Sequence, residues 1–192
     1  MANHNQSQVL TEEQVDHFLK HGYVHLTGCF TRKTAQRWTS DMWMRLGYNP
    51  SDRSTWLAER INMPNHRSES IKTFAPTAWQ AICDLLGGED RITPSSATWE
   101  DGLIVNLGKD SQDWIEPRDL RGWHVDGDSF VHFLNSPEQG LLVIPLFSDI
   151  QPHGGGTILC PEGIKDIAKH LVRLKIVHHT SLPTHFQPLN KY

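Results

Sequence analysis

Residues 122–128 have the sequence Gly-Trp-His-Val-Asp-Gly-Asp, and this segment decides how the fold of the chain is interpreted. Successive side chains of a β-strand point to opposite faces, so a strand here would place His124 and Asp126 on one face. An imidazole and a carboxylate on one face supply two of the three ligands of a non-haem iron site. The chain has 12 histidines, so this spacing also arises by chance. The surroundings of the segment must therefore support the metal site.

Short apolar runs bounded by Gly, Pro, Asn or Asp surround this segment in the second half of the chain. Such runs are typical of strands joined by tight turns. They predict strands at 102–107, 123–126, 130–134, 141–150 and 157–160. The polar stretch 108–121 is predicted as a surface loop, and the glycines at 154–156 indicate a tight turn. The second half is therefore predicted to be mainly β.

The first half of the chain carries helix signals instead. Thr11-Glu12-Glu13-Gln14 matches a capping box and predicts a helix over 12–20, which Gly22 would end. Apolar residues at helical spacing predict three further helices, from Thr31 to about Gly47, from Pro76 to Gly87, and over 162–174. The polar stretch 51–70 is predicted as a loop with one short helix near Trp56. His17, His21 and His25 are interpreted as surface or cap residues.

Composition is that of an ordinary globular protein. A chain of 192 residues with 38% hydrophobic residues suits one domain, predicted over 1–192 with loose tails at 1–9 and 176–192. The net charge of −4 and the lack of a basic run argue against nucleic acid or membrane as the main partner and favour a small-molecule substrate. With no secretion signal and three widely spaced cysteines, a cytoplasmic location is expected.

Three segments together resemble the phytanoyl-CoA dioxygenase-like family of iron(II) and 2-oxoglutarate dependent oxygenases. They are residues 10–24 with the capping box, residues 123–128, and the glycine-rich turn at 154–157. The resemblance spans roughly residues 10–170 and implies a double-stranded β-helix, or jelly roll, buttressed by N-terminal helices. The expected fold class is thus mainly β with N-terminal helices. Because the chain stops at Tyr192, the barrel is expected to be incomplete at its C-terminus.

The resemblance also implies a metal site. His124 and Asp126 would be the first two iron ligands, and a His on a later strand would be the third. His185 is the candidate for that third ligand, because it lies well downstream and off the predicted helix. Asn106 and Thr157 are candidates to hydrogen-bond the co-substrate 2-oxoglutarate. The Arg that pairs with the distal carboxylate of 2-oxoglutarate in that family is not identifiable in this sequence.

Alternatives remain open around this site. Asp128 could replace Asp126 as a ligand, but Gly127 would interrupt the strand between them. Trp99, Trp114 and Trp123 could wall a substrate pocket, although core packing is the more frequent role of Trp.

As the resemblance implies, the protein would be an Fe(II) and 2-oxoglutarate dependent dioxygenase. Such an enzyme couples decarboxylation of 2-oxoglutarate to succinate with oxidation of a C–H bond in a small organic substrate. One alternative is a truncated, catalytically inactive β-barrel that binds a small molecule or a protein partner, and another is a cupin-like metal protein. The exposed sheet edge of an incomplete barrel would also allow self-association. The sequence does not select the substrate.

Overall fold

The computed structural model describes residues 9–108, 115–126, 131, 133, 136 and 140–177. The chain divides into two compact units. The first consists of Met1–Arg121 with Val143–Leu159, and the second of Gly122–Leu142 with Cys160–Tyr192. Most of both predicted tails lies outside the described residues, although residues 176 and 177 belong to a helix. Each helix that the structure describes is too short or too polar to cross a membrane.

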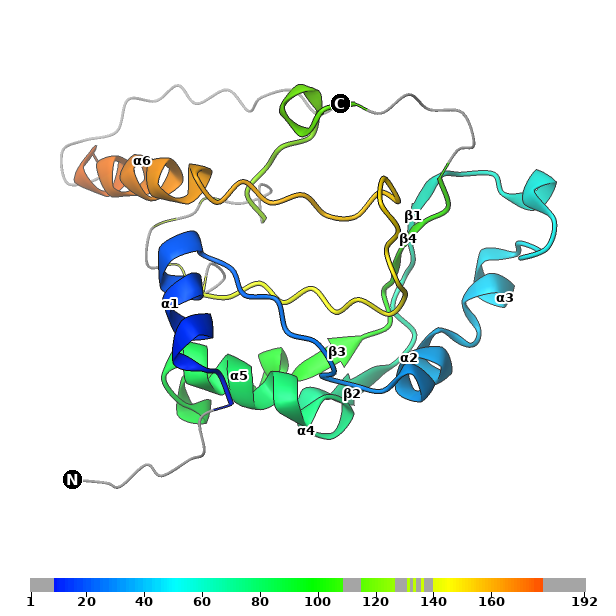
Figure 1. Cartoon of the computed structure of the whole chain (residues 1–192), viewed down its shortest axis with the longest axis horizontal. Coiled ribbons are helices and arrows are strands. Elements are labelled where there is room, and N and C mark those ends of the chain that lie inside the picture. The colour runs from blue at the N-terminus through cyan, green and yellow to red at the C-terminus, as the bar shows by residue number, and fades with distance from the viewer. Residues whose placement is uncertain are drawn as a thin grey trace. The chain divides into compact units, whose positions relative to one another are not determined.

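The predicted jelly roll is wrong. In the described part of the chain, helices account for 42% of residues and strands for 8%, and no barrel is formed. Strand β1 (Arg60–Asn62) pairs antiparallel with β4 (Ile104–Asn106), and β2 (Ser68–Ser70) pairs antiparallel with β3 (Thr98–Glu100). Figure 1 shows these two small sheets in the first unit. The described residues therefore form helices, irregular chain and two short strand pairs.

The predicted strands fail where no partner strand is available. Residues 104–106 confirm the centre of the strand predicted at 102–107, because β1 supplies its backbone hydrogen bonds. The segments 123–126, 141–150 and 157–160 contain no strand, and the strand predicted at 130–134 lies mostly outside the described residues. An apolar run can suit a strand in its side chains, yet a strand also needs a neighbour that completes its ladder of hydrogen bonds.

Two strands lie in the stretch that was predicted as a loop. β1 and β2 come from the polar region 51–70, where short strands with exposed faces show no apolar alternation. Backbone hydrogen bonds to the chain around β3 and β4 hold the two strands in place. The N–H of Met63 donates to the carbonyl of Leu103 at 2.9 Å, and the N–H of Asp101 donates to the carbonyl of Arg67 at 3.1 Å. The short helix predicted near Trp56 is a 3₁₀ turn at Arg53–Thr55.

Helix α1 (Glu12–His21) begins and ends where the sequence predicts. The N–H of Thr11 donates to Gln14 Oε1 at 2.9 Å, and the N–H of Gln14 donates to Thr11 Oγ1 at 3.2 Å, which confirms the capping box. Gly22 ends the helix with a φ of 75°, a conformation that costs glycine little. Both ends of α1 are therefore closed by hydrogen bonds.

Replacing Thr11 by Ala is expected to lower the free energy of unfolding by about 1 kcal/mol, because it leaves the N–H of Gln14 without its cap. The check is urea unfolding of both proteins. Thr27→Ala, at an exposed position outside any helix, is the matched control and is expected to stay within about 0.5 kcal/mol of the parent protein. Equal effects of the two substitutions would contradict a stabilising role for the capping box.

The single helix predicted from Thr31 to Gly47 is two helices. α2 (Arg32–Thr39) and α3 (Met42–Leu46) are separated at Asp41, whose φ of −100° and ψ of 2° are not helical. Asp41 Oδ1 lies 3.3 Å from a guanidinium nitrogen of Arg67, and this ion pair with a distant residue stabilises the non-helical conformation between the two helices. No signal within the helical segment encodes that contact.

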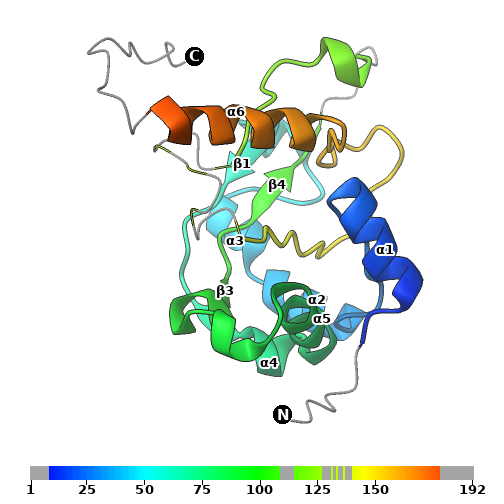
Figure 2. The same cartoon turned by 90° about the vertical axis from the view of Figure 1, so that its left-hand side faces the viewer.

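Of the remaining α-helices, those that begin at Pro76 and Gly163 are close to the sequence predictions, whereas the short one at 71–74 was not predicted. α4 (Ile71–Phe74) leads into α5 (Pro76–Leu86), which has Pro76 in its first turn and Gly87 after its end. α6 (Gly163–Val177) belongs to the second unit and matches the helix predicted at 162–174. Figure 2 shows α4 beside α5 and β1 beside β4 in the first unit.

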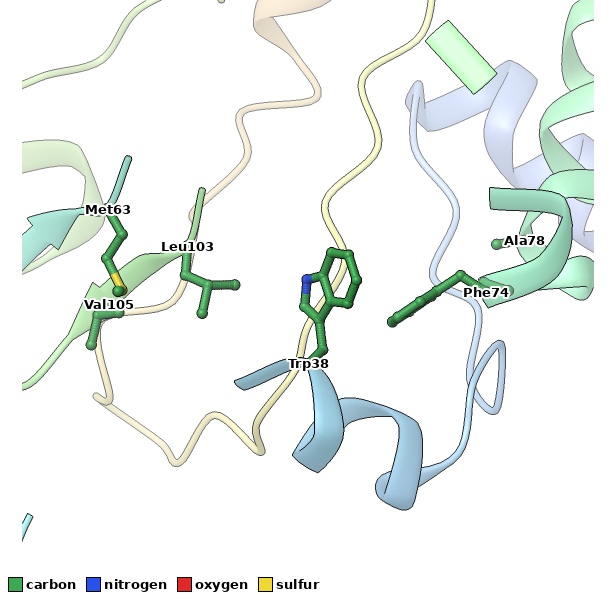
Figure 3. Close-up of a cluster of buried hydrophobic side chains, with 7 residues drawn as sticks. Trp38, Met63, Phe74, Ala78, Leu103 and Val105 are labelled. Atoms are coloured by element: carbon green, nitrogen blue, oxygen red, sulfur yellow. The ribbon is translucent and has the colours of Figure 1, made fainter. Parts of the chain in front are cut away.

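The core of the first unit joins α2, α4, α5 and the strand region. Its buried members are Trp38, Met63, Phe74, Ala75, Ala78, Leu103 and Val105. Figure 3 shows the Trp38 side chain between Phe74 on one side and Leu103 on the other. The residues come from segments far apart in the sequence, so this cluster ties the helices to the strand pairs.

Candidate metal centre

His124 and Asp126 bring a ring nitrogen and a carboxylate oxygen close together in the second unit. His124 Nε2 lies 3.2 Å from Asp126 Oδ1, and the two side chains are 55% and 56% exposed. The segment is not a strand, and Asp126 lies in a turn. The convergence predicted from the spacing is thus present, although the backbone that produces it differs from the predicted one.

The other ring nitrogen of His124 has a defined partner. His124 Nδ1 lies 2.7 Å from the carbonyl oxygen of Gly122. A carbonyl oxygen only accepts, so Nδ1 must carry the hydrogen of this bond. In the neutral ring, Nε2 is then an acceptor that lies 3.2 Å from Asp126 Oδ1. Two acceptors at this distance repel each other unless a proton or a metal ion lies between them.

The separation of the two atoms suits a metal ion. An ion with bonds of about 2.1 Å to both atoms needs them about 3.0 Å apart at a right angle and about 3.4 Å apart at the tetrahedral angle. The observed 3.2 Å lies between these values. A backbone carbonyl on the second nitrogen is also the usual arrangement for a metal-binding His, because it fixes the tautomer and the ring orientation. The pair therefore fits as part of a site for a first-row divalent ion.

The described residues bring no third His, Cys, Asp or Glu side chain to this pair. Within 9–108, 115–126 and 140–177, no group of three or more His, Cys, Asp or Glu side chains is close enough to share a metal ion. His185, the predicted third ligand, lies outside the described residues, as do Asp128 and Trp114. The assignment of His185 stays a prediction.

The two residues predicted to bind 2-oxoglutarate belong to the first unit, whereas the metal pair belongs to the second. Asn106, at the end of β4, donates from Nδ2 to the carbonyl of Gly155 at 2.9 Å and so joins β4 to the glycine-rich turn. Thr157 is exposed just after that turn. The hydrogen bond gives Asn106 a structural role, and the contact of both residues with 2-oxoglutarate stays a prediction.

The tryptophans differ in their surroundings. Trp99 is packed against the core, with its ring centre 5.7 Å from that of Phe74. Trp123 is 47% exposed beside His124. Core packing therefore accounts for Trp99. Trp123 lies near the His124 and Asp126 pair because it is the residue before His124 in the sequence.

One hollow of about 430 Å³ in the first unit was not anticipated from the sequence. It is lined by Arg53, Trp56, Leu57, Ala58, Glu59, Leu107 and Gly108. Trp43 stacks on Trp56 with ring centres 5.4 Å apart, and the Arg53 guanidinium lies 5.3 Å from the Trp56 ring centre. The sequence shows the two tryptophans, but the contact between Trp43 and Trp56 depends on how the chain turns between α3 and β1.

Comparison with family models, with curated proteins and with solved structures finds no match to this chain.

Proposed function

We propose that this protein binds Fe(II) through His124 and Asp126 and uses 2-oxoglutarate as a co-substrate to oxidise a small organic substrate. The observation that carries the proposal is the 3.2 Å approach of His124 Nε2 to Asp126 Oδ1 while Nδ1 is held by the Gly122 carbonyl. One imidazole and one carboxylate are two members of the set of two His and one carboxylate that binds non-haem iron. The order of the three motif segments also supports it. The proposal does not require a jelly roll.

The residues of the chain would bind and orient, and the iron with its co-substrate would supply the activation of dioxygen that side chains cannot perform. The Gly122 carbonyl would hold the His124 ring so that Nε2 faces the ion. Because both ligand side chains are about half exposed, a co-substrate can reach the ion from solvent. His185 is proposed as the third ligand.

Replacing His124 by Ala is expected to abolish Fe(II) binding at this site, because it removes one of the two identified ligands. The experiment is an anaerobic titration of the full chain with Fe(II) and 2-oxoglutarate, followed through the visible charge-transfer band of the ternary complex. The band is expected in the parent protein and not in His124→Ala. His25→Ala, which removes an exposed imidazole from the first unit, is the matched control and should keep the band.

Two outcomes would overturn the proposal. One is the absence of the band from parent protein whose circular dichroism shows it to be folded, and the other is an equal band in the parent protein and His124→Ala. If the band is present and depends on His124, the same titration of His185→Ala decides the third ligand. Succinate released from 2-oxoglutarate in air then provides an assay that needs no knowledge of the substrate.

A further inference from the structure

We infer that His17 and His21 on helix α1 form a second metal site, which binds a divalent transition-metal ion that prefers imidazole ligands, with Zn(II) as the representative ion. The two rings have centres 4.6 Å apart and planes inclined by 37°. The site lies in the first unit and shares no residue with the His124 and Asp126 pair. It is independent of the proposed oxygenase function.

Helix geometry brings the two imidazoles together. Residues four apart in a helix lie one above the other on the same face, so His17 and His21 are neighbours along one edge of α1. Two His at this spacing are also how a helix supplies a pair of zinc ligands in the His-Glu-x-x-His motif. Here the shared feature is the spacing alone, and it provides two nitrogen ligands without any contribution from the rest of the chain.

The separation of the two ring centres is compatible with a shared metal ion. With a metal to nitrogen bond of about 2.05 Å, the centre of a bound imidazole ring lies about 3.2 Å from the ion. Two such rings have centres about 4.5 Å apart when the bonds meet at a right angle and about 5.2 Å apart at the tetrahedral angle. The observed 4.6 Å falls within this range.

The pair is held in place by its surroundings. α1 has a capping box at its start and Gly22 at its end, where the N–H of Gly22 donates to the carbonyl of Phe18 at 2.7 Å. The Tyr23 ring meets the His17 ring edge-on, at 4.8 Å and 89°. Both His side chains are partly buried. A ligand pair that is ordered before binding loses less entropy when the ion binds.

The position along the helix favours a cation. His21 is the last residue of α1, and Lys20 and His21 form its basic last turn. The carbonyl groups at the C-terminal end of a helix carry partial negative charge, which attracts a positive ion. The charge of Lys20 opposes this attraction, but the ligand nitrogens bond the ion directly. The remaining positions on the ion would be filled by water.

Replacing either His17 or His21 by Gln is expected to weaken Zn(II) binding at α1 at least about tenfold, because loss of a direct ligand exceeds the loss from an outer contact. Gln suits a helix interior, so both variants should fold. Zn(II) is titrated calorimetrically into the full chain and each variant. His25→Gln is the control and should retain this binding event.

Imidazole resonances provide the second measurement. In the parent protein, the ring C–H signals of His17 and His21 are expected to shift together as Zn(II) is added, each assigned by its loss in the corresponding variant. Unchanged Zn(II) binding in both Gln variants would overturn the proposal. So would a shift of one ring without the other, since a shared ion must perturb both.

Discussion

Replacing Asp101 by Asn is expected to lower the free energy of unfolding by about 3–5 kcal/mol, because it leaves buried positive charge without its partner. Asp101 is fully buried, at 0% exposure, directly after β3. Its Oδ2 lies 2.8 Å from a guanidinium nitrogen of Arg45, a side chain that is itself only 5% exposed. A loss of this size is a large part of the 5–15 kcal/mol that stabilises a typical domain.

Four donors converge on the Asp101 carboxylate. Oδ1 accepts the backbone N–H groups of His66 and Arg67 at 2.6 and 3.0 Å, and Oδ2 lies 3.3 Å from Arg67 Nε. The carboxylate thereby joins α3, the chain between β1 and β2, and the start of the segment that leads to β4. Asn has the same shape but only one acceptor oxygen, so one set of donors must face its NH₂ group.

An exposed ion pair provides the matched control for Asp101. Arg32 and Asp149 are bonded at 3.0 Å, with side chains 83% and 66% exposed. Asp149→Asn is expected to change stability by no more than about 1 kcal/mol, because water replaces the lost interaction. Urea unfolding of the parent protein and both variants makes the comparison. If the two variants lose equal free energy of unfolding, burial does not make the Asp101 ion pair more stabilising than an exposed one.

Acid should reduce the difference between the parent protein and Asp101→Asn. Burial raises the pKa of Asp101, but the N–H groups of His66 and Arg67 and the charges of Arg45 and Arg67 outweigh burial, so its pKa lies below the ordinary value. A carboxyl with a lowered folded pKa stabilises the protein above the unfolded pKa, about 3.9 for Asp, and loses this stabilisation as pH falls through the folded pKa. The stability gap is therefore expected to be full at neutral pH and to shrink below about pH 4.

Local signals in the sequence predict the helices well and the strands poorly. The cap at Thr11, Pro76 at the start of α5 and Gly87 after its end each act on residues within one helical turn, so the sequence contains the whole interaction. A strand forms only if another segment pairs with it, and the local sequence of the strand does not identify that segment. Residues 141–150 have the apolar side chains of a strand but no partner strand to hydrogen-bond with. β1 has a partner strand, although its sequence shows no apolar alternation.

The candidate sites also differ in how far local sequence signals predict them. The two-residue spacing places His124 and Asp126 on one face only if the segment is a strand. The segment is not a strand, yet His124 Nε2 lies 3.2 Å from Asp126 Oδ1. The hydrogen bond from His124 to Gly122 also lies within the segment, yet it depends on a backbone that is not a strand. The four-residue spacing of His17 and His21 likewise predicts that the two rings share one face of a helix, and their ring centres lie 4.6 Å apart.

Phe74→Ala is the second substitution with a large expected effect, a loss of about 3–5 kcal/mol in the free energy of unfolding. Phe74 ends α4 and is 5% exposed. Its ring centre lies 4.9 Å from that of Trp38 and 5.4 Å from that of Phe30, with Trp99 and Phe147 at 5.7 and 6.1 Å. Alanine would remove the ring on which four aromatic side chains converge and leave a cavity that rigid neighbours fill only in part.

Two further variants separate the cavity from the simple loss of apolar surface. Phe74→Leu keeps most of the volume and is expected to cost about 1.5 kcal/mol, the upper end for hydrophobic replacements of similar size. Met44→Ala, at a side chain that is 78% exposed on α3, should change stability by no more than about 0.5 kcal/mol. Urea unfolding gives all three values. If Phe74→Ala costs no more than Phe74→Leu, the neighbouring rings close over the cavity, and Phe74 is not the centre of the core.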